Sequence, residues 1–402
     1  MNKRLFKALT LSTLFALSTT VLPSCGDDDE DEIVNPDPQE NPQNQENPQN
    51  QEENKNPENQ ENPEEQKEPE ENPEPQAAKE LMFILNEGKM YDNNSTLDIF
   101  RPEATDKKFS GDVYASANGE IIGDTGQDLI RSGNRLYLSV NGSKYLAKID
   151  IATLKVVEKY EFSAEEGEPR QLVADGGYIY VSLYSGQVAR FDTTSITNPQ
   201  YVTVGSNPEG MAVKDGQLLV CNSGWGSDNR LSVIDLNTFT LNRNIELFNN
   251  LQTVTAIKDS VYVTYYDAVY TLRTLVVDLT NDKFFPTKNA TKMSEYNGIL
   301  YCANSETMYD ANWNTFTTTN FFSKDVTTGK VVNNSLIEEK YAKQFAASTV
   351  YFFEVDPFNG DIYIGISDYV TNGEIYRFKN DGTFIEKFTT SSINPNHAVF
   401  VK

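Results

Sequence analysis

Residues 80–402 carry one repeating unit of about 40–45 residues, and this repeat constrains the fold more than any other feature of the sequence. Each unit contains a turn with Gly or Asp, followed by an apolar pair that usually ends in Tyr. The second residue of this pair, called here the marker residue, is found at Tyr137, Tyr180, Leu219, Tyr262, Tyr301 and Tyr363. Successive marker residues are 43, 39, 43, 39 and 62 residues apart. A period in this range is typical of the four-stranded blades of a β-propeller.

A second marker keeps the same period. It is an aspartate that ends an apolar segment before a turn rich in Thr or Asn, at Asp150, Asp192, Asp235, Asp278 and Asp325, with spacings of 42, 43, 43 and 47 residues. Such an aspartate can accept hydrogen bonds from the backbone amides of its turn, which suits a connection between the outer strands of a blade. Helical periodicity is nearly absent, and one helix is expected over residues 336–343 within the long sixth unit.

The two ends of the repeat region complement each other. Residues 82–88 resemble residues 136–142, a second strand without a first strand before it. Residues 394–401 resemble residues 207–213, a first strand without a second strand after it. We therefore predict an all-β, seven-bladed β-propeller over residues 79–402, with its first blade closed by both chain termini. Closure of this kind removes free sheet edges that would invite aggregation.

Residues 1–24 read as a lipoprotein signal peptide. A basic start is followed by an apolar stretch over residues 8–21, which is shorter than the ~20 residues needed to span a bilayer. Residues 22–25 resemble a lipobox, which implies acylation of Cys25; the alternative is an ordinary secretory signal with a chance cysteine. The acidic run over residues 26–32 resembles the surface-export signal of Bacteroidota lipoproteins. We expect a lipid-anchored protein on the extracellular side of an outer membrane.

Residues 25–78 form the expected tether. After Cys25 they are rich in Asn, Gln, Glu and Pro, with 19 acidic residues and 2 lysines, and there is no aromatic residue before Phe83. Such a segment cannot bury enough apolar surface to offset its chain entropy, so it is predicted to be disordered and extended. Residues 79–402 retain −11 of the formal net charge of −25. This moderately acidic domain is not expected to bind nucleic acid.

The chemistry-bearing residues favour binding over catalysis. Cys221 and Cys302 lie in apolar strand patterns two blades apart, so buried free thiols are favoured over a disulfide. His397 is the only histidine, which excludes His-rich metal sites and any mechanism that needs two histidines. The chain has no nucleophile elbow, dinucleotide fingerprint or phosphate loop. We expect no catalytic activity, no bound metal and no cofactor, although a carboxylate pair remains an alternative.

A ligand site is expected at one axial mouth, where the loops between second and third strands meet the turns that lead into the first strands. These loops are rich in Tyr, Trp, Asn, Ser and Gly, which suits a small-molecule or glycan site. The alternative for each aromatic residue is packing between blades, and for His397 a structural role. The candidate residues are Asn86, Tyr91, Asn141, Tyr184, Asn222, Trp225, Tyr265, Tyr266, Asn304, Tyr309, Trp313 and Tyr369 in the loops, with Gln127, Asp128, Arg170 and His397 in the turns.

Residues 205–213 and 231–238 resemble the YncE-like propellers of Bacteroidota. Together with the lipobox and the acidic run, they make the chain similar to the BtuG family of seven-bladed surface lipoproteins. This resemblance implies capture of cobalamin and its delivery to a BtuB-like TonB-dependent outer-membrane transporter. Two other functions stay open: a glycan-binding surface lipoprotein, and a propeller hydrolase or lactonase with a calcium or carboxylate cluster at its channel.

Overall fold

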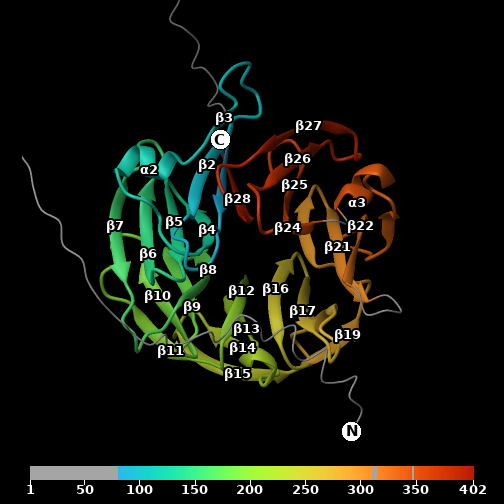
Figure 1. The fold of residues 1–402 in the computed structure, drawn as a ribbon. Helices are drawn as coiled ribbons and strands as arrows, with labels where there is room; N and C mark the ends of the chain where they lie inside the picture. The colour runs from blue at the N-terminus through green and yellow to red at the C-terminus, as the bar shows by residue number, and fades with distance from the viewer. Residues whose placement is uncertain (1–79, 310–314, 346–347) are drawn as a thin grey trace, which may run out of the picture. The chain divides into compact units, whose positions relative to one another are not determined.

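Seven four-stranded antiparallel sheets make up the fold of the residues that the structure, a computed structural model, describes: 80–309, 315–345 and 348–402. The sheets are arranged as the blades of a propeller, and blades that follow one another along the chain are neighbours in the ring (Figure 1). The predicted all-β, seven-bladed architecture is therefore confirmed. Cys25, the leader and the acidic segment up to residue 78 lie outside the described residues.

The blades are numbered here from the one that contains β1, and their strands are given from the axis outward. Blade one consists of β28 (Pro395–Val401), β1 (Leu81–Asn86), β2 (Thr96–Phe100) and β3 (Phe109–Ser110), and blade two of β4 (Gly126–Ser132), β5 (Arg135–Val140), β6 (Tyr145–Asp150) and β7 (Val156–Glu161). Blade three consists of β8 (Pro169–Asp175), β9 (Tyr178–Leu183), β10 (Gln187–Asp192) and β11 (Gln200–Thr203). Blade four consists of β12 (Pro208–Lys214), β13 (Gln217–Asn222), β14 (Arg230–Asp235) and β15 (Thr240–Glu246).

The remaining three blades follow the same order. Blade five consists of β16 (Leu251–Ile257), β17 (Ser260–Tyr266), β18 (Leu272–Asp278) and β19 (Lys283–Pro286). Blade six consists of β20 (Lys292–Tyr296), β21 (Ile299–Tyr309), β22 (Thr315–Asp325) and β23 (Val331–Asn333). Blade seven consists of β24 (Thr349–Val355), β25 (Ile362–Ser367), β26 (Glu374–Phe378) and β27 (Phe384–Thr389). Short helices occur at α2 (Val113–Asn118), η1 (Gly224–Gly226) and α3 (Glu339–Phe345).

Blade one contains strands from distant parts of the chain. β28 pairs with β1 in antiparallel register, from Leu81 opposite Val401 to Leu85 opposite His397. β28 also lies beside β4 of blade two and β24 of blade seven. The last described strand thus supplies the innermost strand of the blade that the first described strand begins.

Both sequence markers have a structural basis. The marker residues all lie in the second strands of their blades, and the marker aspartates end the third strands. Each aspartate accepts a hydrogen bond from its own turn, for example 2.9 Å from the amide of Thr153 to Asp150 and 2.7 Å from the amide of Thr328 to Asp325. The predicted role of these turns is confirmed.

Blade six departs from the sequence prediction. β21 and β22 form one continuous hairpin that remains paired from Ile299 opposite Asp325 to Tyr309 opposite Thr315. The prediction that Asn304 and Tyr309 lie in a loop is wrong, because both residues lie in β21 and are paired with β22. The expected helix begins at Glu339 rather than at residue 336, since Leu336 and Ile337 are buried in the hydrophobic core instead.

Apolar side chains fill the spaces between blades. One cluster joins Leu85 and Val399 of blade one to Leu129 and Leu138 of blade two, and further clusters link later blades in the same way. Cys221 and Cys302 are buried free thiols, as predicted. In the described part of the chain, no helix has the length and apolar character that a membrane crossing requires.

The innermost strands approach closely enough to require glycine at one point. A Cβ built on Gly210 in β12 would lie 2.8 Å from the Cα of Thr253 and 2.9 Å from the carbonyl oxygen of Gln252, both in β16. Because both contacts are backbone atoms, no side-chain rearrangement could relieve them. Gly210 therefore sets the spacing between blades four and five at the axis.

Candidate ligand-binding mouth

β-Bulges in the innermost strands aim side chains at the propeller axis. The register shifts next to the second strand in six of the seven blades that the structure describes, in β28, β4, β8, β12, β16 and β24. A bulge inserts an extra residue and redirects its side chain. The unpaired residues that reach the axial cavity are Gln127, Arg170, Gln171, Gln252, Tyr351 and Asn396.

These bulges surround an axial cavity of about 510 Å³, a size within the usual range of small-molecule sites. Amide side chains of Gln127, Gln252 and Asn396 provide hydrogen-bonding groups on its wall. Four tyrosines add aromatic surface, and blade six contributes a cation and a carboxylate. The tyrosines are Tyr266, Tyr270, Tyr351 and Tyr369, and the charged residues of blade six are Lys292 and Glu306.

Arg170 links several of the predicted site residues. Its guanidinium donates 2.7 Å and 3.1 Å hydrogen bonds to the buried carboxylate of Glu209 and another hydrogen bond to the amide oxygen of Gln127. It also lies 4.9 Å from the ring centroid of Tyr184. The ring of Tyr184 in turn meets the edge of Trp225 at 5.9 Å. Burial raises the pKa of Tyr184 to about 12, so its hydroxyl stays protonated and can donate at neutral pH.

A second group of ionisable residues lies on the opposite wall. The Tyr351 hydroxyl donates to the carboxylate of Glu87, and burial raises the pKa of that carboxylate. Burial also lowers the pKa of Lys292, against the opposing effects of Glu354 and Glu87. Lys292 lines the cavity, and its ammonium makes no hydrogen bond and no ion pair within 4 Å among the described residues. Its ammonium is therefore available to a ligand.

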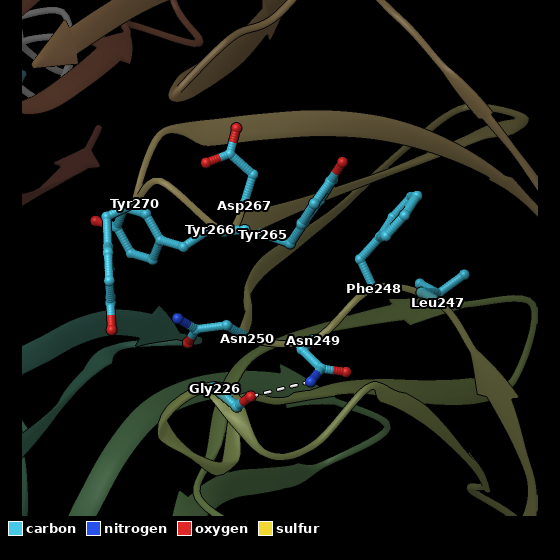
Figure 2. A pocket seen from close by; sticks show the side chains of 10 residues that line it. Gly226, Leu247, Phe248, Asn249, Asn250, Tyr265, Tyr266, Asp267 and Tyr270 are labelled. Atoms are coloured by element: carbon cyan, nitrogen blue, oxygen red, sulfur yellow. Dashed lines mark hydrogen bonds between the residues drawn. The ribbon is translucent and has the colours of Figure 1, made fainter. Parts of the chain in front are cut away.

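A second cavity of about 570 Å³ adjoins the first. Tyr266 and Tyr270 line both, so these two residues form the border between the adjoining spaces. Figure 2 shows Tyr265 and Phe248 toward one end and Tyr270 toward the other, with Asn249 and Asn250 between. This side groove runs between blades four and five and is more strongly aromatic than the axial cavity.

Three predicted asparagines hold the loops rather than face the cavity. Asn86 donates to Asp98 at 2.8 Å, and Asn141 donates to the carbonyl of Pro169 at 3.0 Å. Asn222 donates to the carbonyl of Arg230 at 2.7 Å and accepts from the amide of Gly205 at 2.9 Å. All three are buried. Each amide satisfies polar backbone or side-chain groups at the base of the mouth, which explains why asparagine recurs there.

The remaining predicted residues lie at different places in the fold. Asp128 is buried and accepts from the amide of Leu172 at 2.8 Å, and its carboxylate lies 3.6 Å from Nδ1 of His397, which is partly exposed. Tyr91 is 74% exposed on the loop between β1 and β2. Asn304 lies on the long hairpin of blade six, with its buried amide oxygen unpaired. The side chain of Tyr309 and the whole of Trp313 lie outside the described residues.

The predicted set and the observed cavity thus overlap in part. Gln127, Arg170, Tyr266 and Tyr369 line the axial cavity, and Tyr265 lines the side groove. The sequence did not predict several cavity residues, because a β-bulge does not alter the alternation of apolar and polar residues by which a strand is recognised. The missed residues of the axial cavity include Glu87, Gln252, Tyr270, Lys292, Tyr351 and Asn396. Across the described segments, no three His, Cys, Asp or Glu side chains are grouped in a way that could hold a metal ion.

Comparison with solved structures supports the fold. No family model and no curated protein matches the chain. Hydrazine synthase from Kuenenia stuttgartiensis is similar, with a TM-score of 0.53 and 14% identity over 67% of this chain and 92% of that chain. Apo AztD from Citrobacter koseri has a TM-score of 0.49 and 10% identity, over 80% and 98% of the two chains. The likeness to hydrazine synthase, at 14% identity, shows a shared fold and carries no information about the ligand.

Proposed function

We propose that this propeller is a capture protein for cobalamin, which it binds at the axial mouth without chemical conversion. The observation that carries the proposal is the convergence of bulge-borne amides with four tyrosines around one cavity. Cobalamin has a broad apolar corrin face with a rim of amide groups. Aromatic rings suit the face, and the side chains of Gln127, Gln252 and Asn396 suit the amide rim.

The proposed delivery step rests on the sequence. The resemblance of the leader and acidic run to those of Bacteroidota surface lipoproteins supports an anchor at Cys25 and an extracellular position. A long tether would keep the binding domain near a TonB-dependent transporter and raise its effective concentration there. Metabolic labelling with a radioactive fatty acid tests the anchor, because the label should be incorporated into the wild-type chain and absent from Cys25→Ser. Labelling of both proteins would rule out Cys25 as the acylation site.

Calorimetry tests the binding proposal directly. The full chain with Cys25→Ser, which keeps it out of the membrane, is titrated with cyanocobalamin. We expect saturable binding, and we expect Gln252→Ala to weaken it about tenfold, equivalent to one lost hydrogen bond in a buried site. Gln200→Ala, on the exposed strand β11, is the matched control and should bind like the parent protein. The absence of heat at micromolar protein would refute the proposal.

Two competing functions give different results in the same preparation. A glycan-binding protein would bind soluble oligosaccharides and ignore cyanocobalamin, because tyrosine and tryptophan rings also stack on sugar faces. A hydrolase or lactonase would turn over an ester or lactone substrate and depend on added calcium. Either result would replace cobalamin capture as the function of the mouth.

A further inference from the structure

The side groove between blades four and five is built differently from the axial cavity. At one end, the rings of Phe248 and Tyr265 stack in parallel, with centroids 4.6 Å apart and planes 11° apart. Phe248 is 43% exposed although it packs against this partner. A preformed, solvent-facing aromatic pair offers a flat surface to another planar ring at little cost in side-chain entropy.

Hydrogen-bonding groups accompany this aromatic surface. Asn249 uses its amide nitrogen to donate to the carbonyl of Gly226 at 3.0 Å, which fixes the side chain and leaves its oxygen free among the described residues (Figure 2). The hydroxyls of Tyr265 and Tyr270 also have no hydrogen-bond partner in the described part of the chain. Asp267, by contrast, is fully engaged with the amides of its own loop and with a neighbouring arginine.

The groove lies directly beside the axial cavity, and this position indicates its occupant. Because Tyr266 and Tyr270 border both spaces, a ligand in the axial cavity can extend into the groove without leaving the protein surface. The groove, at about 570 Å³, can therefore take a second part of the same molecule. Its chemistry calls for a planar heteroaromatic ring attached to a hydroxyl-bearing group.

We propose that the side groove is a second subsite, which binds the heteroaromatic base and ribose of the ligand while its macrocyclic part lies at the axial mouth. The inference rests on the proposed function, since cobalamin carries such a nucleotide side arm. The base stacks on the outer, exposed face of the Phe248–Tyr265 pair, and the free oxygen of Asn249 accepts from a ribose hydroxyl. The groove thus determines whether the protein distinguishes complete cobalamin from its base-free precursors.

Comparison of cyanocobalamin with dicyanocobinamide, which lacks the nucleotide arm, tests this inference. Both compounds are titrated into the full chain carrying Cys25→Ser. We expect cyanocobalamin to bind about tenfold more tightly, the difference that one base–aromatic stack produces. Phe248→Ala should reduce this ratio to about one by weakening cyanocobalamin alone. Phe248→Leu should do the same while preserving apolar volume, which guards against a folding defect.

Phe285→Ala is the matched control, because Phe285 is a phenylalanine of similar exposure on the outer strand β19 of blade five. It should leave the ratio unchanged. Equal affinity of the parent protein for the two compounds would overturn the subsite, as would a ratio that persists in both Phe248 variants. If neither compound binds, the proposed function fails and the subsite fails with it. Binding of both compounds with no effect of Phe248 overturns the subsite alone.

Discussion

Glu80 and Asp356 form a buried acid pair at the seam between blade one and blade seven. Glu80 directly precedes β1 and is 1% exposed, whereas Asp356 directly follows β24 and is fully buried. The side chains are in hydrogen-bond contact, yet Glu80 Oε1 and Asp356 Oδ2 have no donor among the described residues. Two carboxylates cannot bond to each other, because neither has a hydrogen to donate. A single shared proton satisfies both oxygens.

The shared proton makes the stability of the domain depend on pH. Burial, together with the neighbouring Asp356 and Glu103, raises the pKa of Glu80 from 4.5 to about 8, although Arg377 opposes the change. Each pKa unit is equivalent to about 1.4 kcal/mol, so up to about 5 kcal/mol of folding free energy is involved. Because the folded-state pKa is the higher one, this stability is fully present below pH 4.5 and is lost as the pH rises through about 8.

Glu80→Gln removes the titration and keeps the hydrogen bond, since the amide nitrogen of glutamine donates to Asp356 at every pH. We expect the variant to differ from the parent protein by less than about 1 kcal/mol at pH 5 and to exceed its stability by up to about 5 kcal/mol at pH 9. For a domain of this size, that difference raises Tm by roughly 7 °C. Thermal unfolding at several pH values between 5 and 9, followed by circular dichroism, measures it.

The control variant is Glu161→Gln, whose side chain is 79% exposed. It should shift Tm by less than about 1 °C across this range. Burial also raises the pKa values of Glu87 and Glu354, but their contributions are common to the parent and the variant and cancel in the difference. Parallel pH profiles for the parent and Glu80→Gln would refute the shared proton. A variant that is less stable at pH 9 would refute it as well.

Three further predictions concern the ring and its core. Gly210→Ala should lower the free energy of unfolding by about 1–3 kcal/mol, because the new methyl group meets the backbone of β16. An unchanged midpoint of denaturant unfolding would mean that the innermost strands move apart freely. Arg170→Met should cost about 3–5 kcal/mol by leaving Glu209 buried without its cation, and adding Glu209→Met should recover most of that loss. Burial raises the pKa of the Cys221 and Cys302 thiols, so both should resist a thiol reagent in the native protein and react after unfolding.

The repeat made most of the architecture predictable. Strand pairs, the number of blades and the turns at the marker aspartates all follow from local patterns that recur at one period. Blade six was less predictable because its hairpin continues past the sheet, and residues such as Asn304 and Asn320 look like loop residues although they pair across two strands. Helix α2, with six residues, is too short to produce a recognisable hydrophobic period.

The site was predicted less completely than the fold, for a physical reason. A side chain reaches the axis when a bulge turns it there, and a bulge depends on the neighbouring strand rather than on the identity of one residue. Gln127 and Arg170 were found because the sequence placed them in turns that lead into first strands; they lie instead within β4 and β8, at bulges close to the start of each strand. Gln252 and Tyr351 lie in strands that look regular in the sequence, so only the register in the structure shows that they are unpaired.

One position of the repeat shows how seven similar blades can form a specific ligand-binding site. Four residues after the marker residue, blades three, five and six carry Tyr184, Tyr266 and Ser305, and the corresponding residue of blade one is Glu87. Three of these four line the axial cavity, and Tyr184 packs beneath the guanidinium of Arg170. The blade fixes the backbone geometry at this position, while the residue type varies: blades two, four and seven carry the buried residues Asn141, Ser223 and Ser367 there. We therefore expect the ligand to be recognised at this repeat position, where the backbone placement is the same in each blade but the residue type differs. Substitutions of its cavity-lining residues should change binding without changing the fold.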